Sequence, residues 1–180
     1  MIKMNNTLIL CDLDGTLIDS DELNSYSYIT AIERLGFDVP PELKFNKRIT
    51  EKELRNCMPL LSEENILLIK ELKLNIFLEN MNMLRLNTNL LDEITKSDAS
   101  VFICTSSKIE RAESECKMLN INRDVIIPSK KTKAELNRIV NELAGKFCKF
   151  DRIICYDDNE DVIKAAAECG FETVLVKFGT

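Results

Sequence analysis

Short apolar runs alternate with helical patterns over the second half of the chain. Runs rich in β-branched residues indicate strands at 7–11, 100–104, 125–127, 152–156 and 173–177. Capping signals and apolar residues at helical spacing indicate helices between the strands, opening near Ser107, Thr132 and Asp161. Strands that alternate with helices form mostly parallel sheets covered on both faces. The pattern therefore predicts an α/β fold.

The stretch between the first two strands has a helical pattern only. Apolar residues recur at helical spacing after Ser20, and capping signals open further helices at Thr50 and Ser62, so no strand is expected there. Because the first strand belongs to the sheet, this segment must leave the sheet and return to it. The predicted domains are an α/β core at 1–19 and 88–180 and an inserted helical subdomain at 20–87.

Composition and charge narrow the classes of partner. The 180 residues suffice for one substantial hydrophobic core. The net charge is -6 and the chain has no basic run, which favours small diffusible partners over nucleic acid or a membrane. The apolar stretch before Asp12 is too brief for a signal peptide core or a membrane span. Seven cysteines without a Cys-x-x-Cys pair fit free thiols in a reducing compartment. We expect a cytoplasmic protein, of open oligomeric state.

The absence of histidine from the sequence restricts the chemistry. It excludes Cys/His zinc sites, Ser-His-Asp triads and Cys-His nucleophile pairs. Any catalysis must rest on carboxylates, lysine, arginine, hydroxyls, thiols or a metal held by oxygen.

Polar residues follow three of the predicted strands, at the end where open parallel sheets bind ligands. Asp12 and Asp14 follow the first strand, 105–107 (Thr-Ser-Ser) the second, and Asp157 and Asp158 a third. Acids at i and i+2 after a strand point the same way, and their crowding costs energy unless a cation relieves it. Each acid alone also fits an acidic turn or helix start. Since oxygen ligands suit Mg²⁺, Asp12 and Asp14 with Asp157 or Asp158 are predicted to gather around one such ion.

The string Asp12-Leu13-Asp14-Gly15-Thr16-Leu17, followed by Asp19-Ser20, resembles the first motif of the haloacid dehalogenase superfamily of phosphohydrolases. The resemblance implies a Rossmann-like parallel sheet with helices on both faces and a small α-helical cap inserted after this motif. It implies a Mg²⁺-dependent phosphatase acting on a small phosphorylated metabolite through an aspartyl-phosphate. Asp12 would be the nucleophile, and Asp14 the proton donor, with its backbone carbonyl on the metal. Asp14 argues against dehalogenation, because a halide leaves without a proton.

The resemblance extends to two further motifs. Thr105 looks like the second motif, a hydroxyl that binds phosphate, with Ser106 beside it; a local bond to the following helix is the alternative for Thr105. A phosphate site also needs a fixed positive charge. The candidates are Lys130, Lys131 and Lys133, in a stretch similar to the third motif but without its prolines. Lys131 is preferred, with Lys133 close behind.

The fourth motif resembles the acidic stretch at Asp157 and Asp158, with Tyr156 where many members have glycine. In the predicted cap, Arg48 is a candidate for binding the leaving group, although an exposed basic residue is the plainer interpretation. Two other functions stay open. One is a phosphomutase of sugar phosphates with the same intermediate, and the other is a catalytically inactive binding or regulatory protein.

Overall fold

The protein is described by a computed structural model that covers residues 6–178. These residues form two compact units, one made of 6–19 with 86–178 and the other of Ser20–Arg85. The predicted helical subdomain was 20–87. Residues 1–5 and 179–180, which the predicted core domain includes, lie outside the described residues.

The first unit is built on a parallel five-stranded sheet in the order β5-β4-β1-β6-β7. This confirms the predicted α/β class. The strands are β1 (Thr7–Cys11), β4 (Ser100–Thr105), β5 (Ile126–Pro128), β6 (Arg152–Asp157) and β7 (Glu172–Leu175). The central position of β1 between β4 and β6 explains its unbroken apolar sequence, because a strand covered on both faces buries every side chain.

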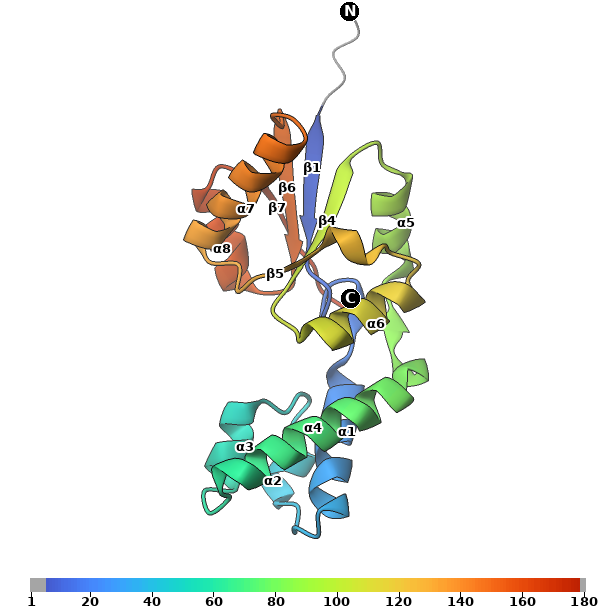
Figure 1. Cartoon of the computed structure of the whole chain (residues 1–180), viewed down its shortest axis with the longest axis vertical. Helices are drawn as coiled ribbons and strands as arrows, with labels where there is room; N and C mark the ends of the chain where they lie inside the picture. Colours follow the sequence, from blue (N-terminus) through green and yellow to red (C-terminus); the bar gives the residue numbers. More distant parts are fainter. Residues whose placement is uncertain (1–5, 179–180) are drawn as a thin grey trace, which may run out of the picture. The chain divides into compact units, whose positions relative to one another are not determined.

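Helices cover both faces of this sheet (Figure 1). One face carries α5 (Thr88–Lys96) and α6 (Ile109–Met118), and the other carries α7 (Lys133–Lys146) and α8 (Glu160–Glu168). A short 3-10 helix, η2 (Arg123–Val125), precedes β5. The core under α7 and α8 is a cluster of buried apolar side chains that includes Leu8, Leu10, Leu136, Ile139 and Val162.

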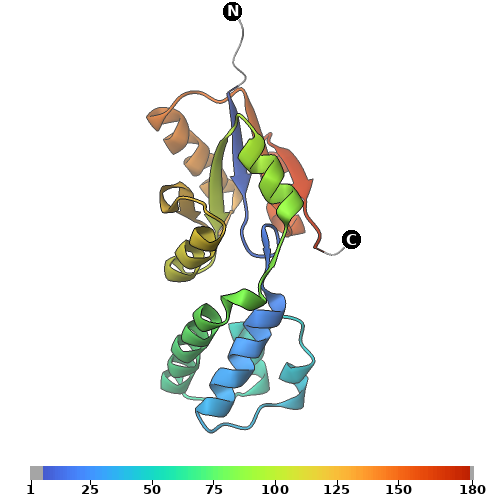
Figure 2. The same cartoon turned by 90° about the vertical axis from the view of Figure 1, so that its right-hand side faces the viewer.

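The second unit is helical. It contains α1 (Asp21–Arg34), α2 (Pro41–Lys44), α3 (Glu51–Cys57), α4 (Glu63–Glu79) and the 3-10 helix η1 (Met81–Met83). Helices α1 and α4 lie side by side (Figures 1 and 2) and bury Tyr28, Ile32, Ile69 and Ile76 in their own core. As predicted, Thr50 forms a capping box with Glu53, and Ser62 caps α4. Among the residues that the structure describes, no helix is long and apolar enough to cross a bilayer.

Three local features differ from the predictions. Strand β3 (Arg85–Leu86) lies where no strand was expected and pairs with β2 (Ile18–Asp19), because a two-residue strand leaves no periodicity to detect. Helix α5 was not predicted. Ser107 does not open α6, whose N-cap is Lys108. The Ser107 hydroxyl donates instead to Asp14, a carboxylate acceptor on another segment of the sheet unit.

Candidate active site

Three predicted site residues lie at the carboxyl ends of neighbouring strands. Cys11 on β1 is level with Ile103 on β4 and Tyr156 on β6, which places Asp12 and Asp157 side by side. The Asp12 N–H donates to the Tyr156 carbonyl at 2.9 Å. Asp12, Thr105 and Asp157 are at most 5% exposed. The three strand ends thus form one buried polar cluster, at the edge of the sheet where parallel α/β proteins bind ligands.

Lys131 closes this cluster. Its ammonium donates to Oδ1 of Asp12 and to Oδ2 of Asp157, each at 2.6 Å, and the side chain is buried. The backbone of Lys131 has a φ of 58°, the left-handed region that few non-glycine residues adopt. Ser129 stabilises this turn, because its hydroxyl accepts the Lys131 N–H at 2.9 Å and its own N–H donates to the Thr105 carbonyl at 2.8 Å. The strained turn therefore aims the lysine at the carboxylates.

Burial and the neighbouring charges have opposite effects on the pKa of Asp12, and also on the pKa of Lys131. Burial raises the pKa of Asp12 to about 7, against the lowering effect of Lys131, and the neighbouring carboxylate of Asp157 adds to the rise. Burial acts to lower the pKa of Lys131, but Asp12 and Asp157 outweigh it and raise that pKa above its usual range. Lys131 therefore stays positively charged. Because two carboxylates surround this one ammonium, a second cation would complete the charge balance of the cluster.

Three carboxylates converge closely enough to hold a metal ion. Asp12, Asp157 and Asp158 each offer one oxygen, and these oxygens lie within 4.8 Å of one another. Asp157 is oriented by the Asn159 N–H, which donates to its Oδ1 at 2.9 Å, and Asp158 is exposed. An all-oxygen set with an open side suits Mg²⁺, which retains several waters. The residues present therefore fit the predicted metal.

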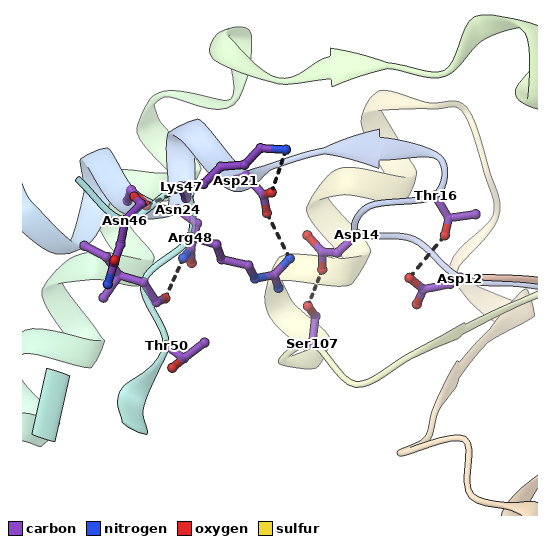
Figure 3. A network of polar contacts seen from close by, with 12 residues as sticks. Asp12, Asp14, Thr16, Asp21, Asn24, Asn46, Lys47, Arg48, Thr50 and Ser107 are labelled. Carbon is purple, nitrogen blue, oxygen red and sulfur yellow. Dashed lines mark hydrogen bonds and ion pairs between the residues drawn. The ribbon is translucent and has the colours of Figure 1, made fainter. Parts of the chain in front are cut away.

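The Asp14 side chain belongs to a different set of contacts. Its Oδ2 accepts a hydrogen bond from the Ser107 hydroxyl at 2.5 Å (Figure 3), and its Oδ1 accepts one from Arg111. Arg111 in turn donates from Nε to Glu115 at 2.9 Å. Of the four predicted metal ligands, Asp14 is the one whose carboxylate is not among the converging acids. Metal binding through its backbone carbonyl stays a prediction.

Ser107 and Arg111 are the site residues that sequence reasoning missed. Ile109, at the start of α6, is 39% exposed, whereas Arg111 and Glu115 are buried. An arginine and a glutamate four residues apart are equally typical of an exposed helix face, so their spacing alone did not indicate burial.

The other predicted residues divide between the cluster and the surface. The Thr105 hydroxyl accepts the Ser107 N–H at 3.1 Å, which is the local bond expected as the alternative. Ser106 and Lys130 are exposed. Lys133 is exposed and pairs with Glu168 at 3.1 Å, so the structure does not bring it to the acidic cluster. Lys133 is the first residue of α7.

Arg48 lies in the helical unit, on the segment before α3. Its guanidinium pairs with Asp21 at 3.3 Å, and Lys47 pairs with the same carboxylate at 3.6 Å (Figure 3). The segment is held against α1 by two buried side chains. Asn24 donates to the Ile49 carbonyl at 2.7 Å, and Ser25 donates to the Lys47 carbonyl at 3.0 Å.

Tyr156, where the resemblance led us to expect glycine, lies within β6. Its hydroxyl donates to Glu93 on α5 at 2.8 Å. Because successive strand side chains point to opposite faces, a large residue here leaves the Asp157 side free.

Gly15 offers a direct test of the acidic cluster. A Cβ on Gly15 would lie 2.2 Å from Oδ2 of Asp158, and its φ is +83°. We expect Gly15→Ala to displace the exposed Asp158 carboxylate and to weaken Mg²⁺ binding about tenfold or more, as losses of metal-supporting groups do. Isothermal titration with Mg²⁺ measures this effect.

Gly36→Ala is the matched control, because its φ is +81° but nothing lies within 4 Å of the added Cβ. Both variants should lose about 1–2 kcal/mol of stability from the left-handed backbone. Only Gly15→Ala should lose metal affinity. Equal Mg²⁺ affinity in the two variants would remove Asp158 from the metal site.

Several solved structures share the fold of this chain. A hydrolase of the haloacid dehalogenase-like family from Streptococcus pneumoniae is 22% identical, with 94% of this chain and 83% of that chain covered and a TM-score of 0.65. A predicted phosphoglycolate phosphatase from Haemophilus somnus is 17% identical (95% and 85% covered, TM-score 0.70). A protein proposed to be a beta-phosphoglucomutase from Thermotoga maritima is 19% identical (92% and 82% covered, TM-score 0.68).

These identities show likeness of fold alone. No curated protein matches the sequence. The profile of the haloacid dehalogenase-like hydrolases, however, matches residues 9–176, which is most of the chain and includes every residue of the acidic cluster. The protein therefore belongs to the haloacid dehalogenase-like hydrolase family.

Proposed function

We propose that the protein is a Mg²⁺-dependent phosphatase that hydrolyses a small phosphorylated metabolite through an aspartyl-phosphate. One observation carries the proposal: the Lys131 ammonium bridges Asp12 and Asp157 at the carboxyl ends of adjacent strands, beside an exposed third acid. A buried nucleophilic carboxylate, a fixed cation and a metal-binding acid set are the parts that phosphoryl transfer needs.

Asp12 and Asp14 divide the covalent chemistry. An Asp12 carboxylate oxygen attacks phosphorus, and the bond from phosphorus to the ester oxygen breaks. Asp14 gives its proton to the departing alkoxide, then takes a proton from the water that attacks the aspartyl-phosphate. Inorganic phosphate leaves, Asp12 is regenerated, and Asp14 holds a proton again. Lys131 neutralises charge on the phosphoryl oxygens throughout.

Asp12, Asp157 and Asp158 would hold the metal, with the Asp14 backbone carbonyl as a further ligand. A bound Mg²⁺ supplies positive charge that offsets both the carboxylates and the incoming phosphate. The buried acids fit this role, because burial raises the pKa of Asp12 and a cation opposes that rise.

Substrate binding is assigned to groups on both units. Thr105 and Ser106 are proposed to hydrogen-bond phosphate oxygens from the end of β4. Arg48 is proposed to bind an anionic or hydroxylated leaving group, which gives the helical unit the role of a specificity cap. Asn24 and Ser25 support this assignment, because they fix the segment that carries Arg48. A cytoplasmic location stays a prediction.

The test is a phosphate-release screen over sugar phosphates, nucleotides and phosphoglycolate-like acids. We expect inorganic phosphate to appear with Mg²⁺, to vanish with excess EDTA, and to return when Mg²⁺ is restored. Phosphate moved to another hydroxyl of a sugar, with none released, would identify a phosphomutase. Inertness toward the whole panel would favour a binding or regulatory protein.

A further inference from the structure

A buried charge cluster adjoins the proposed acid–base residue. Arg111 on α6 is 5% exposed and Glu115, one turn later, is 0% exposed. The Arg111 guanidinium donates to Oδ1 of Asp14, and its Nε donates to Oε1 of Glu115 at 2.9 Å. We propose that Arg111 is a positioning residue that orients the Asp14 carboxylate for proton transfer, and that Glu115 fixes Arg111. The inference rests on the phosphatase function proposed above.

Stability alone does not account for this cluster. Removing ions from water costs solvation free energy that a buried pair often fails to recover, and apolar residues of similar volume serve at least as well. The neighbouring buried positions of α6, Ala112 and Cys116, are small and apolar. The chain places another arginine–glutamate pair of the same spacing, Arg138 and Glu142, on an exposed face of α7. Surface pairs of that kind are the ordinary use of this spacing.

The contacts of Asp14 indicate that its carboxylate is held in one orientation, beyond having its charge balanced. Its two carboxylate oxygens accept from different groups, Oδ1 from Arg111 and Oδ2 from the Ser107 hydroxyl at 2.5 Å. Ser107 lies just before α6 and Arg111 lies in its first turn, so one short segment supplies the donors to both oxygens. The Arg111 guanidinium is held at Nε by Glu115 and donates from Nη2 to Oδ1 of Asp14, a fixed planar geometry that a flexible lysine ammonium does not provide. Arg111 thus limits the rotation of the group that must face the leaving oxygen.

The dependence on leaving group separates positioning from a structural role. Transfer to Asp12 needs a proton from Asp14 when an alkoxide leaves, whereas p-nitrophenolate leaves without one. For Arg111→Lys we expect kcat/KM to fall about 100-fold on an alkyl phosphate, such as glycerol phosphate, and by no more than about threefold on p-nitrophenyl phosphate. A structural defect would lower both values alike.

Three variants complete the experiment. In an Asp14→Asn background, Arg111→Lys should cause no further loss on the alkyl phosphate, because the two residues act as one unit. The double variant Arg111→Met with Glu115→Gln removes the cation and its partner carboxylate on α6 together, so α6 keeps no unpaired buried charge. If Arg111→Lys folds poorly, this double variant should reproduce the selective loss on the alkyl phosphate. Arg138→Lys, in the exposed pair, should leave kcat/KM unchanged on both substrates.

The outcomes discriminate between the two proposals. Equal losses on both phosphate esters, or additive losses with Asp14→Asn, would overturn the role of Arg111 and leave the phosphatase intact. A wild-type protein that hydrolyses neither these two esters nor any phosphate of the screening panel would overturn the phosphatase itself, and the role of Arg111 with it.

Discussion

Asp12→Asn is expected to abolish phosphate release, with kcat/KM falling by about 10⁴-fold or more, as the loss of a covalent nucleophile does. An amide keeps the shape of the carboxylate but cannot attack phosphorus. Acid-quenched wild-type protein should carry a phosphoryl group that hydroxylamine removes, and the variant should carry none. Wild-type turnover by Asp12→Asn would contradict the aspartyl-phosphate mechanism.

Folding should survive this substitution, which makes the loss of activity interpretable. Asp12 is 5% exposed, and burial raises its pKa to about 7, so the folded state bears a cost for its charge. A neutral amide removes that cost, while Lys131 retains its bond to Asp157 at 2.6 Å. We expect the thermal unfolding midpoint of the variant to be no lower than that of the wild type.

Lys131→Met is expected to cost both activity and stability. It leaves the buried carboxylates of Asp12 and Asp157 without their shared ammonium, and breaking a buried ion pair in this way typically costs about 3–5 kcal/mol. Added Mg²⁺ should recover more stability in the variant than in the wild type, because the metal is then the nearest cation. Urea unfolding with and without Mg²⁺ measures both effects.

Lys133→Met is the matched control for Lys131→Met. Lys133 is exposed and pairs with Glu168 at the surface, so its loss should change stability by no more than about 0.5 kcal/mol and leave turnover unaltered. A large loss of turnover in Lys133→Met, with Lys131→Met active, would reverse the assignment of the phosphate-binding lysine.

The sheet and its functional edge were predictable because both depend on local patterns. Apolar runs indicated the strands, and the polar residues that follow them identified the edge that binds ligands. Asp12 and Asp157 lie side by side because β1 and β6 are paired in register, and Thr105 ends the neighbouring strand β4. The sequence also favoured Lys131 over Lys133, but only its left-handed backbone and the Ser129 hydroxyl show how the ammonium reaches the acids.

The contacts of Asp14 could not be predicted, because they depend on which face α6 turns toward the sheet. Capping rules indicated that Ser107 would begin α6, yet the Asp14 carboxylate across the site offers its hydroxyl a charged acceptor. An apolar moment assigns Arg111 to the surface, and only its bonds to Asp14 and Glu115 explain why it is buried. Charged groups that satisfy one another over long sequence separations leave no periodic trace.

The pairing of β2 with β3 has a consequence for the length of the segment inserted between them. The chain leaves the sheet unit next to Asp19 and re-enters it at Leu86, and the two crossings run side by side as a hydrogen-bonded ribbon. Since both ends of the insertion are already joined, exchanging it for a longer or shorter one adds little loop-closure entropy to the fold. The fold of the sheet unit should therefore tolerate a shortened or lengthened helical segment between β2 and β3.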